Sequence, residues 1–250
     1  MVEKYGIGTR HVTNEGYEVE VVEKIENDRR RRIRFDNGYE VWVFMHNIKS
    51  GEVKNPYHPS VFGVGYFGIG DYVAAIKGKH TTEYAAWKDM IRRCYDDKFQ
   101  QRWTTYVGTT ICKEWHNFQN FARWHEENYP SVVGIKFHLD KDLLQSDIEN
   151  KIYSPDTCLF LPHNVNRFLA NKQSNNTSGY IGVCWHKTKK KWVAQITLFE
   201  EGKTKHLGIF STPEDASLVY QEARAIESEK VKEYLRSLNY LPEEVINSLK

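Results

Sequence analysis

The chain has 250 residues, of which 40% are hydrophobic and 14% aromatic, which is too much apolar side chain for a disordered protein. At this length we expect more than one compact unit. The formal net charge is only +2, so a basic surface has to come from a local excess of lysine and arginine. We expect a cytoplasmic protein, because the sequence contains neither a signal-peptide core nor a membrane-length apolar stretch.

Residues 1–75 are predicted to form a small β-rich domain, either a meander or a barrel. Apolar and polar residues alternate in three runs between residues 17 and 43, as expected of half-buried strands. The Asp-Asn-Gly sequence at 36–38 predicts the hairpin between the last two runs. Residues 29–32 are four consecutive arginines at the start of a strand, which indicates either a solvated hairpin tip or a phosphate contact.

A glycine-rich passage at residues 63–70 follows. A G-x-G-x-x-G phosphate loop requires a β-α-β context that is missing here, so a linker or a tight backbone approach is expected. From Thr81, which with Thr82 is a candidate N-cap, the apolar period becomes helical. Two helices are predicted next, and the side chains on their apolar faces are more typical of a core than of a cofactor site. They are Tyr84, Trp87, Ile91 and Cys94 in the first helix, and Trp115, Phe118, Phe121, Ala122 and His125 in the second.

Residues 136–171 resemble the ββα-metal unit of the HNH-type (His-Asn-His) nucleases that phages encode. The stretch before this unit is similar as well, in Trp87, in the pair Arg93-Cys94 and in the Ile-Cys-Lys-Glu-Trp sequence at 111–115. The elements predicted in the unit are a strand over 136–143, a turn over 150–155, a strand over 158–161 and a helix over 162–171. Such a unit hydrolyses a phosphodiester with one divalent metal, while a nearby base takes a proton from water.

The resemblance assigns Asp140 and Asn166 as ligands of a divalent metal, expected to be magnesium because both offer oxygen. It places Thr157, or the adjacent Asp156, where the family has an Asn that braces the loop. The family's general base is a His directly after the Asp, and this chain has Lys141 there. A lysine is protonated at neutral pH unless burial or neighbouring cations lower its pKa. Lys141 is thus either a base with a lowered pKa or a fixed cation that stabilises the transition state, and the other candidate bases are His138, His163 and Tyr153.

Residues 173–228 are predicted to form three strands and a helix. Thr212 is a good N-cap for this helix and Pro213 suits its first position. Residues 173–210 carry six lysines against two glutamates, whereas residues 211–250 carry five basic and eight acidic residues. The strands are therefore suited to meet an anion and the helix is not.

Three motifs in this region resemble the Apetala/ethylene-response-factor type of DNA-binding domain: Tyr-x-Gly-Val at 180–183, Lys-Trp-x-Ala-x-Ile at 191–196 and Leu-Gly-x-Phe at 207–210. In that family one sheet face packs on the helix and the other enters the major groove, which implies duplex DNA as the partner. The positions that would face the groove are Cys184, His186, Gln195, Thr197, Thr204 and His206, and the lysines suited to phosphates are Lys187, Lys189 and Lys191. Members that read a defined site usually place arginines there, so strong base specificity is not expected.

The sequence thus predicts a multi-domain α+β protein with domains at 1–75, 76–172 and 173–228 and a helical extension at 229–250, which either covers the core or joins a partner. The combination resembles mobile homing endonucleases of phages, which implies a magnesium-dependent DNA endonuclease in the cytoplasm of a bacterial host cell. The alternative is a catalytically decayed nuclease that acts as a DNA-binding regulator, which Lys141 favours. A third hypothesis is a protein-binding inhibitor of a host factor.

Overall fold

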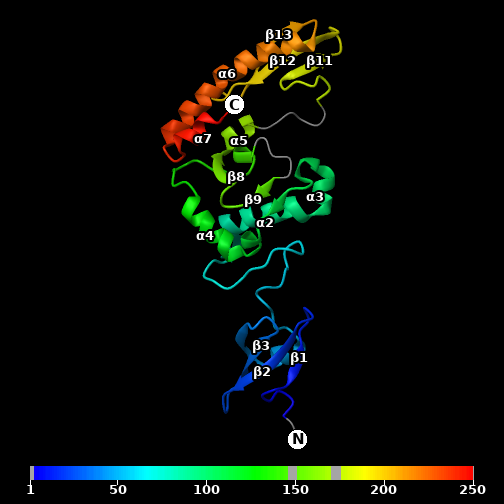
Figure 1. The fold of residues 1–250 in the computed structure, drawn as a ribbon, viewed down its shortest axis with the longest axis vertical. Coiled ribbons are helices and arrows are strands. Elements are labelled where there is room, and N and C mark those ends of the chain that lie inside the picture. Colours follow the sequence, from blue (N-terminus) through cyan, green and yellow to red (C-terminus); the bar gives the residue numbers. More distant parts are fainter. Residues whose placement is uncertain (1–2, 146–150, 170–175, 250) are drawn as a thin grey trace. The chain divides into compact units, whose positions relative to one another are not determined.

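The computed structural model describes residues 3–145, 151–169 and 176–249. Helices and several antiparallel sheets alternate along this part of the chain, which confirms the predicted α+β class (Figure 1). The chain divides into two compact units, Met1–Trp124 and His125–Lys250. The expected turn start at 150, helix end at 171 and domain boundary at 172 lie outside the described residues.

The first unit begins with the predicted meander, a four-stranded antiparallel sheet in the order β1-β2-β3-β4. Its elements are β1 (Arg10–Val12), β2 (Glu18–Lys24), β3 (Arg30–Phe35) and β4 (Glu40–Phe44), followed by helix α1 (Met45–Ser50). Strand alternation buries Val21 and Ile33, which are 0% exposed, against Ile48 of α1. Gly38 has a φ of 84°, as the predicted hairpin turn requires.

The arginines of β3 are held in ion pairs within this unit. The pairs are Arg30–Asp28 (2.8 Å), Arg31–Glu3 (3.2 Å), Arg32–Glu23 (2.9 Å), Arg32–Glu40 (2.6 Å) and Arg34–Glu40 (2.7 Å). Arg31 is buried and also donates to the backbone carbonyl of Tyr5. The charges of the four β3 arginines are therefore matched by carboxylates.

The rest of the first unit is mainly helical. It contains β5 (Ala75–Ile76), β6 (Lys79–His80), α2 (Thr82–Tyr95), α3 (Asp97–Arg102), η1 (Thr104–Tyr106), β7 (Thr110–Ile111), η2 (Lys113–His116) and the start of α4 (Phe118–Asn128). The predicted cap is confirmed, because the Thr81 hydroxyl accepts from the Tyr84 N–H at 3.3 Å. The fully buried Trp87 donates its indole N–H to the Trp115 carbonyl at 2.7 Å. A Cβ at Gly65 would lie 2.8 Å from the Trp87 ring, so this glycine serves a tight backbone approach.

The second unit opens with a strand-strand-helix arrangement at the place the sequence predicts. It comprises β8 (Phe137–Asp140), η3 (Leu143–Gln145), β9 (Ile152–Tyr153), β10 (Leu159–Pro162) and α5 (His163–Leu169), with β8 and β10 antiparallel. Strand β8 is shorter than the predicted run over 136–143. It ends at Asp140 because the carboxylate of Asp140 accepts the backbone N–H groups of Asp142 and Leu143, which turns the chain.

A three-stranded antiparallel sheet and a long helix complete the second unit. The elements are β11 (Val183–His186), β12 (Lys191–Thr197), β13 (Thr204–Phe210), α6 (Pro213–Leu238) and α7 (Glu243–Asn247). Figure 1 shows α6 running along this sheet. The contact is close because small side chains meet, Ala194 from β12 and Ala216 from α6, both 0% exposed. The predicted N-cap is confirmed, since the Thr212 hydroxyl accepts from the Asp215 N–H.

Helix α6 continues without a break past residue 228 and ends at Leu238, and its C-cap Asn239 has a φ of 49°. Its second half packs on the strand-strand-helix arrangement rather than standing free. The residues buried together there are Leu161, Val165, Phe199, Val231, Leu235, Ile246 and Leu249. The extension thus covers a core, which answers the question that the sequence left open. None of the helices in the described residues is both long and apolar enough to cross a membrane.

Candidate functional site

His138 and Asp140 project from the same face of β8, because side chains two residues apart in a strand share a face. Cross-strand pairing with β10 places His138 opposite Leu161 and Asp140 opposite Leu159. Leu161 is fully buried against Val165 of α5, so α5 lies over this face. The face of β8 that carries His138 and Asp140 is therefore the face on which α5 packs.

The Asp140 carboxyl is 7% exposed, and its Oδ1 accepts the N–H groups of Asp142 at 3.0 Å and Leu143 at 2.8 Å. Burial raises the pKa of Asp140 above its ordinary value, and the backbone hydrogen bonds and the charge of Lys141 only partly offset this. Within the described residues Oδ2 accepts no hydrogen bond. A buried carboxylate with a raised pKa and one oxygen that accepts no hydrogen bond is suited to bind a cation. The cation would offset the cost of burying the negative charge.

The two candidate histidines come together. The ring centroids of His138, on β8, and His163, the first residue of α5, lie 4.9 Å apart with an interplanar angle of 44°. His163 is exposed and His138 is half-buried. The turn from β10 into α5 thus places His163 beside His138, which lies two residues before Asp140 on β8. The two rings form an imidazole pair that solvent can reach.

Asn166, the second predicted metal ligand, is half-buried on α5, one helical turn after His163. No hydrogen bond joins it to Asp140 within the described residues. The part of the chain that the structure describes also contains no cluster of three His, Cys, Asp or Glu side chains suited to a metal ion. A cation at this site would rest on Asp140 with amide, imidazole or water ligands.

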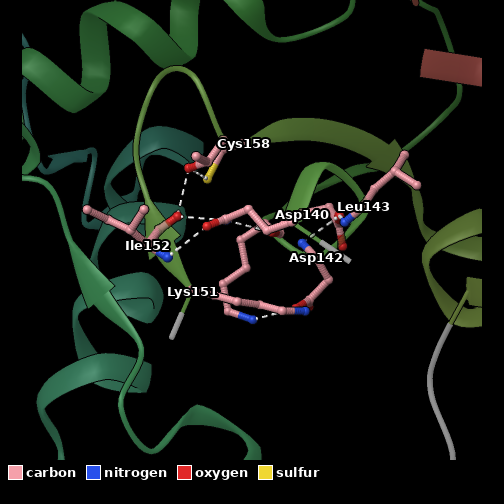
Figure 2. A network of polar contacts seen from close by, with 9 residues as sticks. Asp140, Asp142, Leu143, Lys151, Ile152 and Cys158 are labelled. Atoms are coloured by element: carbon pink, nitrogen blue, oxygen red, sulfur yellow. Dashed lines mark hydrogen bonds and ion pairs between the residues drawn. The ribbon is translucent and has the colours of Figure 1, made fainter. Parts of the chain in front are cut away.

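Lys141 is paired with a carboxylate. Its Nζ is 2.8 Å from Oδ1 of Asp142 and 5.7 Å from the ring centroid of Tyr153, and the side chain is 5% exposed. Lys151 reaches the same Asp142 oxygen (Figure 2). Burial alone would raise the pKa of Asp142, but the hydrogen bonds and charges of the two lysines outweigh it and lower that pKa. The ion pair with Asp142 occupies the Lys141 Nζ, which does not suit a general base.

Gln145, which the sequence did not indicate, forms a polar brace after Asp140 together with Thr157. Gln145 is 2% exposed, and its amide donates to the carbonyls of Lys141 and Ile152 while accepting the Ile152 N–H at 3.0 Å. Thr157 completes the brace by donating to the Ile152 carbonyl at 2.7 Å and accepting the Ser154 N–H at 3.0 Å. Of the two residues at the bracing position, Thr157 makes these contacts.

Two further side chains near the loop are buried. Tyr153 is 1% exposed beneath Lys141, so its phenol is remote from solvent. Burial raises the pKa of the Cys158 thiol to about 12, which makes it unreactive. Neither of them suits the role of a base or a nucleophile as well as the imidazole pair does.

The strand register of the second sheet places the predicted groove-facing residues on one face. Val183 and Ala194 are cross-strand partners turned toward α6, so residues next to them in each strand turn away from it. Gln195 pairs with His206 and Thr197 with Thr204, which puts those β13 residues on the same free face. The face away from α6 thus carries Cys184, His186, Gln195, Thr197, Thr204 and His206.

The lysines next to this face are exposed. Lys187 and Lys189 lie in the turn between β11 and β12, and Lys191 begins β12. The backbone N–H of Lys189 donates to Nδ1 of His186 at 3.3 Å. This contact assigns the proton of a neutral His186 to Nε2, so that the ring is a donor at its outer edge.

Comparisons with known proteins do not add to this geometry. No family model, no curated protein and no solved structure matches the chain. The function proposed next therefore depends on the site and on the two sequence resemblances.

Proposed function

We propose that the chain is a metal-dependent endonuclease of duplex DNA of the HNH type, with the C-terminal sheet holding the duplex and the strand-strand-helix arrangement cleaving it. The observation that carries the proposal is the imidazole pair of His138, two residues before the buried Asp140 on β8, and His163 of α5. A hydrolytic site requires a proton acceptor beside an anionic ligand set, and these three side chains supply both.

Asp140 and Asn166 would hold the divalent cation, with magnesium favoured by their oxygen ligands. A bound cation neutralises the phosphate and stabilises the leaving oxygen. One imidazole of the pair takes the proton of the attacking water, and the other orients it through ring contact. Lys141, ion-paired with Asp142, would contribute positive charge near the scissile phosphate.

The competing function is a DNA-binding regulator built on a nuclease that has lost activity. The observation in its favour is that the family's base position holds Lys141, and that this lysine is ion-paired and 5% exposed. Under this hypothesis the sheet face over β11–β13 still binds duplex DNA, while the strand-strand-helix arrangement serves only as a scaffold.

Cleavage of supercoiled plasmid separates these functions. With magnesium or manganese we expect nicked or linear product, and with a chelator none. Asp140→Ala should abolish the product, and His138→Ala or His163→Ala should lower its rate by about 10²- to 10⁴-fold, the usual contribution of a base. His46→Ala, at an exposed histidine of the first unit, is the matched control and should leave the rate unchanged. A wild-type protein that binds duplex DNA yet never cleaves it with metal would refute the endonuclease and favour the regulator.

A further inference from the structure

Strands β5 and β6 form a small hairpin in the first unit. Ala75 pairs with His80 and Ile76 with Lys79, and Lys77 and Gly78 form the turn with φ angles of 49° and 76°. Positive φ at both central residues is the signature of a type I′ turn, whose twist suits a two-residue hairpin. Every residue from 75 to 80 is exposed.

The base of the hairpin is held by hydrogen bonds to its neighbours in the first unit. The Thr81 N–H donates to the Ala74 carbonyl at 3.1 Å, which adds a third residue pair to the β5–β6 ladder. The Thr81 hydroxyl donates to the Val73 carbonyl at 3.0 Å. The buried side chain of Gln119 bonds both the N–H and the carbonyl of Tyr72, at 3.0 and 2.9 Å. Because Thr81 also caps α2, the ribbon has a fixed direction relative to α2.

The charge of the hairpin is unmatched, in contrast to that of the β3 arginines. Residues 72–82 contain no Asp or Glu, and within the described residues neither Lys77 nor Lys79 forms an ion pair. Ile76, the cross-strand partner of Lys79, is 60% exposed beside them. Two free ammonium groups flanking an exposed aliphatic side chain match the phosphates and base edges of nucleic acid better than they match a protein surface.

We propose that this hairpin is a second DNA contact, with Lys77 and Lys79 on backbone phosphates and Ile76 directed into the groove. The inference rests on the proposed DNA-binding function. Three residue pairs at about 3.3 Å per residue give a ribbon of about 10 Å, comparable with the roughly 8.5 Å depth of the major groove, which admits a two-stranded β-ribbon. Ile76 there contacts apolar base edges such as the thymine methyl group.

The test measures the affinity of the full chain for a fluorescent 30-base-pair duplex at several potassium chloride concentrations. Loss of two phosphate contacts in Lys77→Ala/Lys79→Ala should reduce the slope of log affinity against log salt by about 1.8 and weaken binding about tenfold or more near 0.1 M salt. Lys77→Arg/Lys79→Arg should keep both values. Lys54→Ala/Lys113→Ala, which removes the same charge at exposed positions elsewhere in the unit, should change the slope little.

The outcomes distinguish the hairpin from the proposed function as a whole. If the wild-type chain binds duplex DNA and the hairpin variant has the slope of the charge-matched control, the hairpin is not a contact and the inference fails alone. If the wild type shows no salt-dependent binding at all, the proposed function fails with it. Unchanged thermal unfolding of the hairpin variants, expected because these side chains are exposed, ties a lower slope to the lost contacts.

Discussion

Asp140 and Asp142 are two residues apart, and the fold moves their pKa values in opposite directions. Burial raises the pKa of Asp140, so its charge is a cost to the folded state at neutral pH. Asp142 is also affected by burial, but Lys141 and Lys151 lower its pKa, so its charge is stabilising. A buried charge that the protein keeps at a cost is typical of a functional residue, whereas a matched one is typical of structure.

We therefore expect Asp140→Asn and Asp142→Asn to change stability in opposite senses. Asp140→Asn keeps an oxygen for the two N–H groups and removes the buried charge, so the free energy of unfolding at pH 7 should rise, on the order of 1 kcal/mol. Asp142→Asn leaves the buried Lys141 without its carboxylate and should lower the free energy of unfolding by about 1 to 3 kcal/mol. Thermal unfolding measures both.

The pH dependence supplies the check on this prediction. The free-energy cost of the buried Asp140 charge is fully present above the raised pKa of the folded state. It disappears as the pH falls through that pKa toward the pKa of the unfolded state, so Asp140→Asn should no longer be more stable than the wild type in acid. The contribution of Asp142 is present above its unfolded pKa and lost as the pH falls through the lowered folded one. Magnesium or manganese should raise the melting temperature of the wild type and not of Asp140→Asn. A lower melting temperature for Asp140→Asn at pH 7 would contradict this account.

At the scale of elements, what the sequence predicted correctly depends on neighbours in the chain. The caps Thr81 and Thr212 and the turn at 36–38 are local signals, and each is confirmed. The role of Gln145 was not predictable, because its partners are backbone groups at Lys141 and Ile152 that only the folded loop brings to it. Pairing of the β3 arginines likewise depends on strand register, which composition does not reveal.

The turn between β11 and β12 carries the element-scale prediction. Its lysines are exposed and suited to phosphates, so Lys187→Ala/Lys189→Ala/Lys191→Ala should weaken binding to all duplexes alike and reduce the salt slope by about 2.7. The control Lys230→Ala/Lys232→Ala alters α6, where both lysines are paired with glutamates, and should keep the slope. Anisotropy with two unrelated duplexes measures this. A loss confined to one duplex would instead indicate base recognition by this turn.

At the scale of the second unit, α6 belongs to two cores at once. Its first half packs Ala216 on the sheet of β11–β13, and its second half packs Val231 and Leu235 on β10 and α5. Phe199, just after β12, joins the second core, where its N–H is held by the Glu227 carboxylate of α6 at 2.8 Å. The proposed DNA-binding face and the proposed cleavage site thus share one continuous helix, which sets their separation.

This shared helix predicts cooperative unfolding of the second unit. Leu235 is 0% exposed in the core with Leu161 and Val165, and Leu235→Ala should lower the free energy of unfolding by about 2 to 5 kcal/mol. Because α6 also carries the sheet, hydrogen exchange should report the same loss of protection for amides of β12 as for those of β10 and α5. Leu218→Ala, at a leucine of the same helix that is 60% exposed, should leave protection nearly unchanged. Faster exchange in β10 and α5 with unaltered β12 would mean that the two cores open independently, and that α6 does not couple cleavage site and sheet.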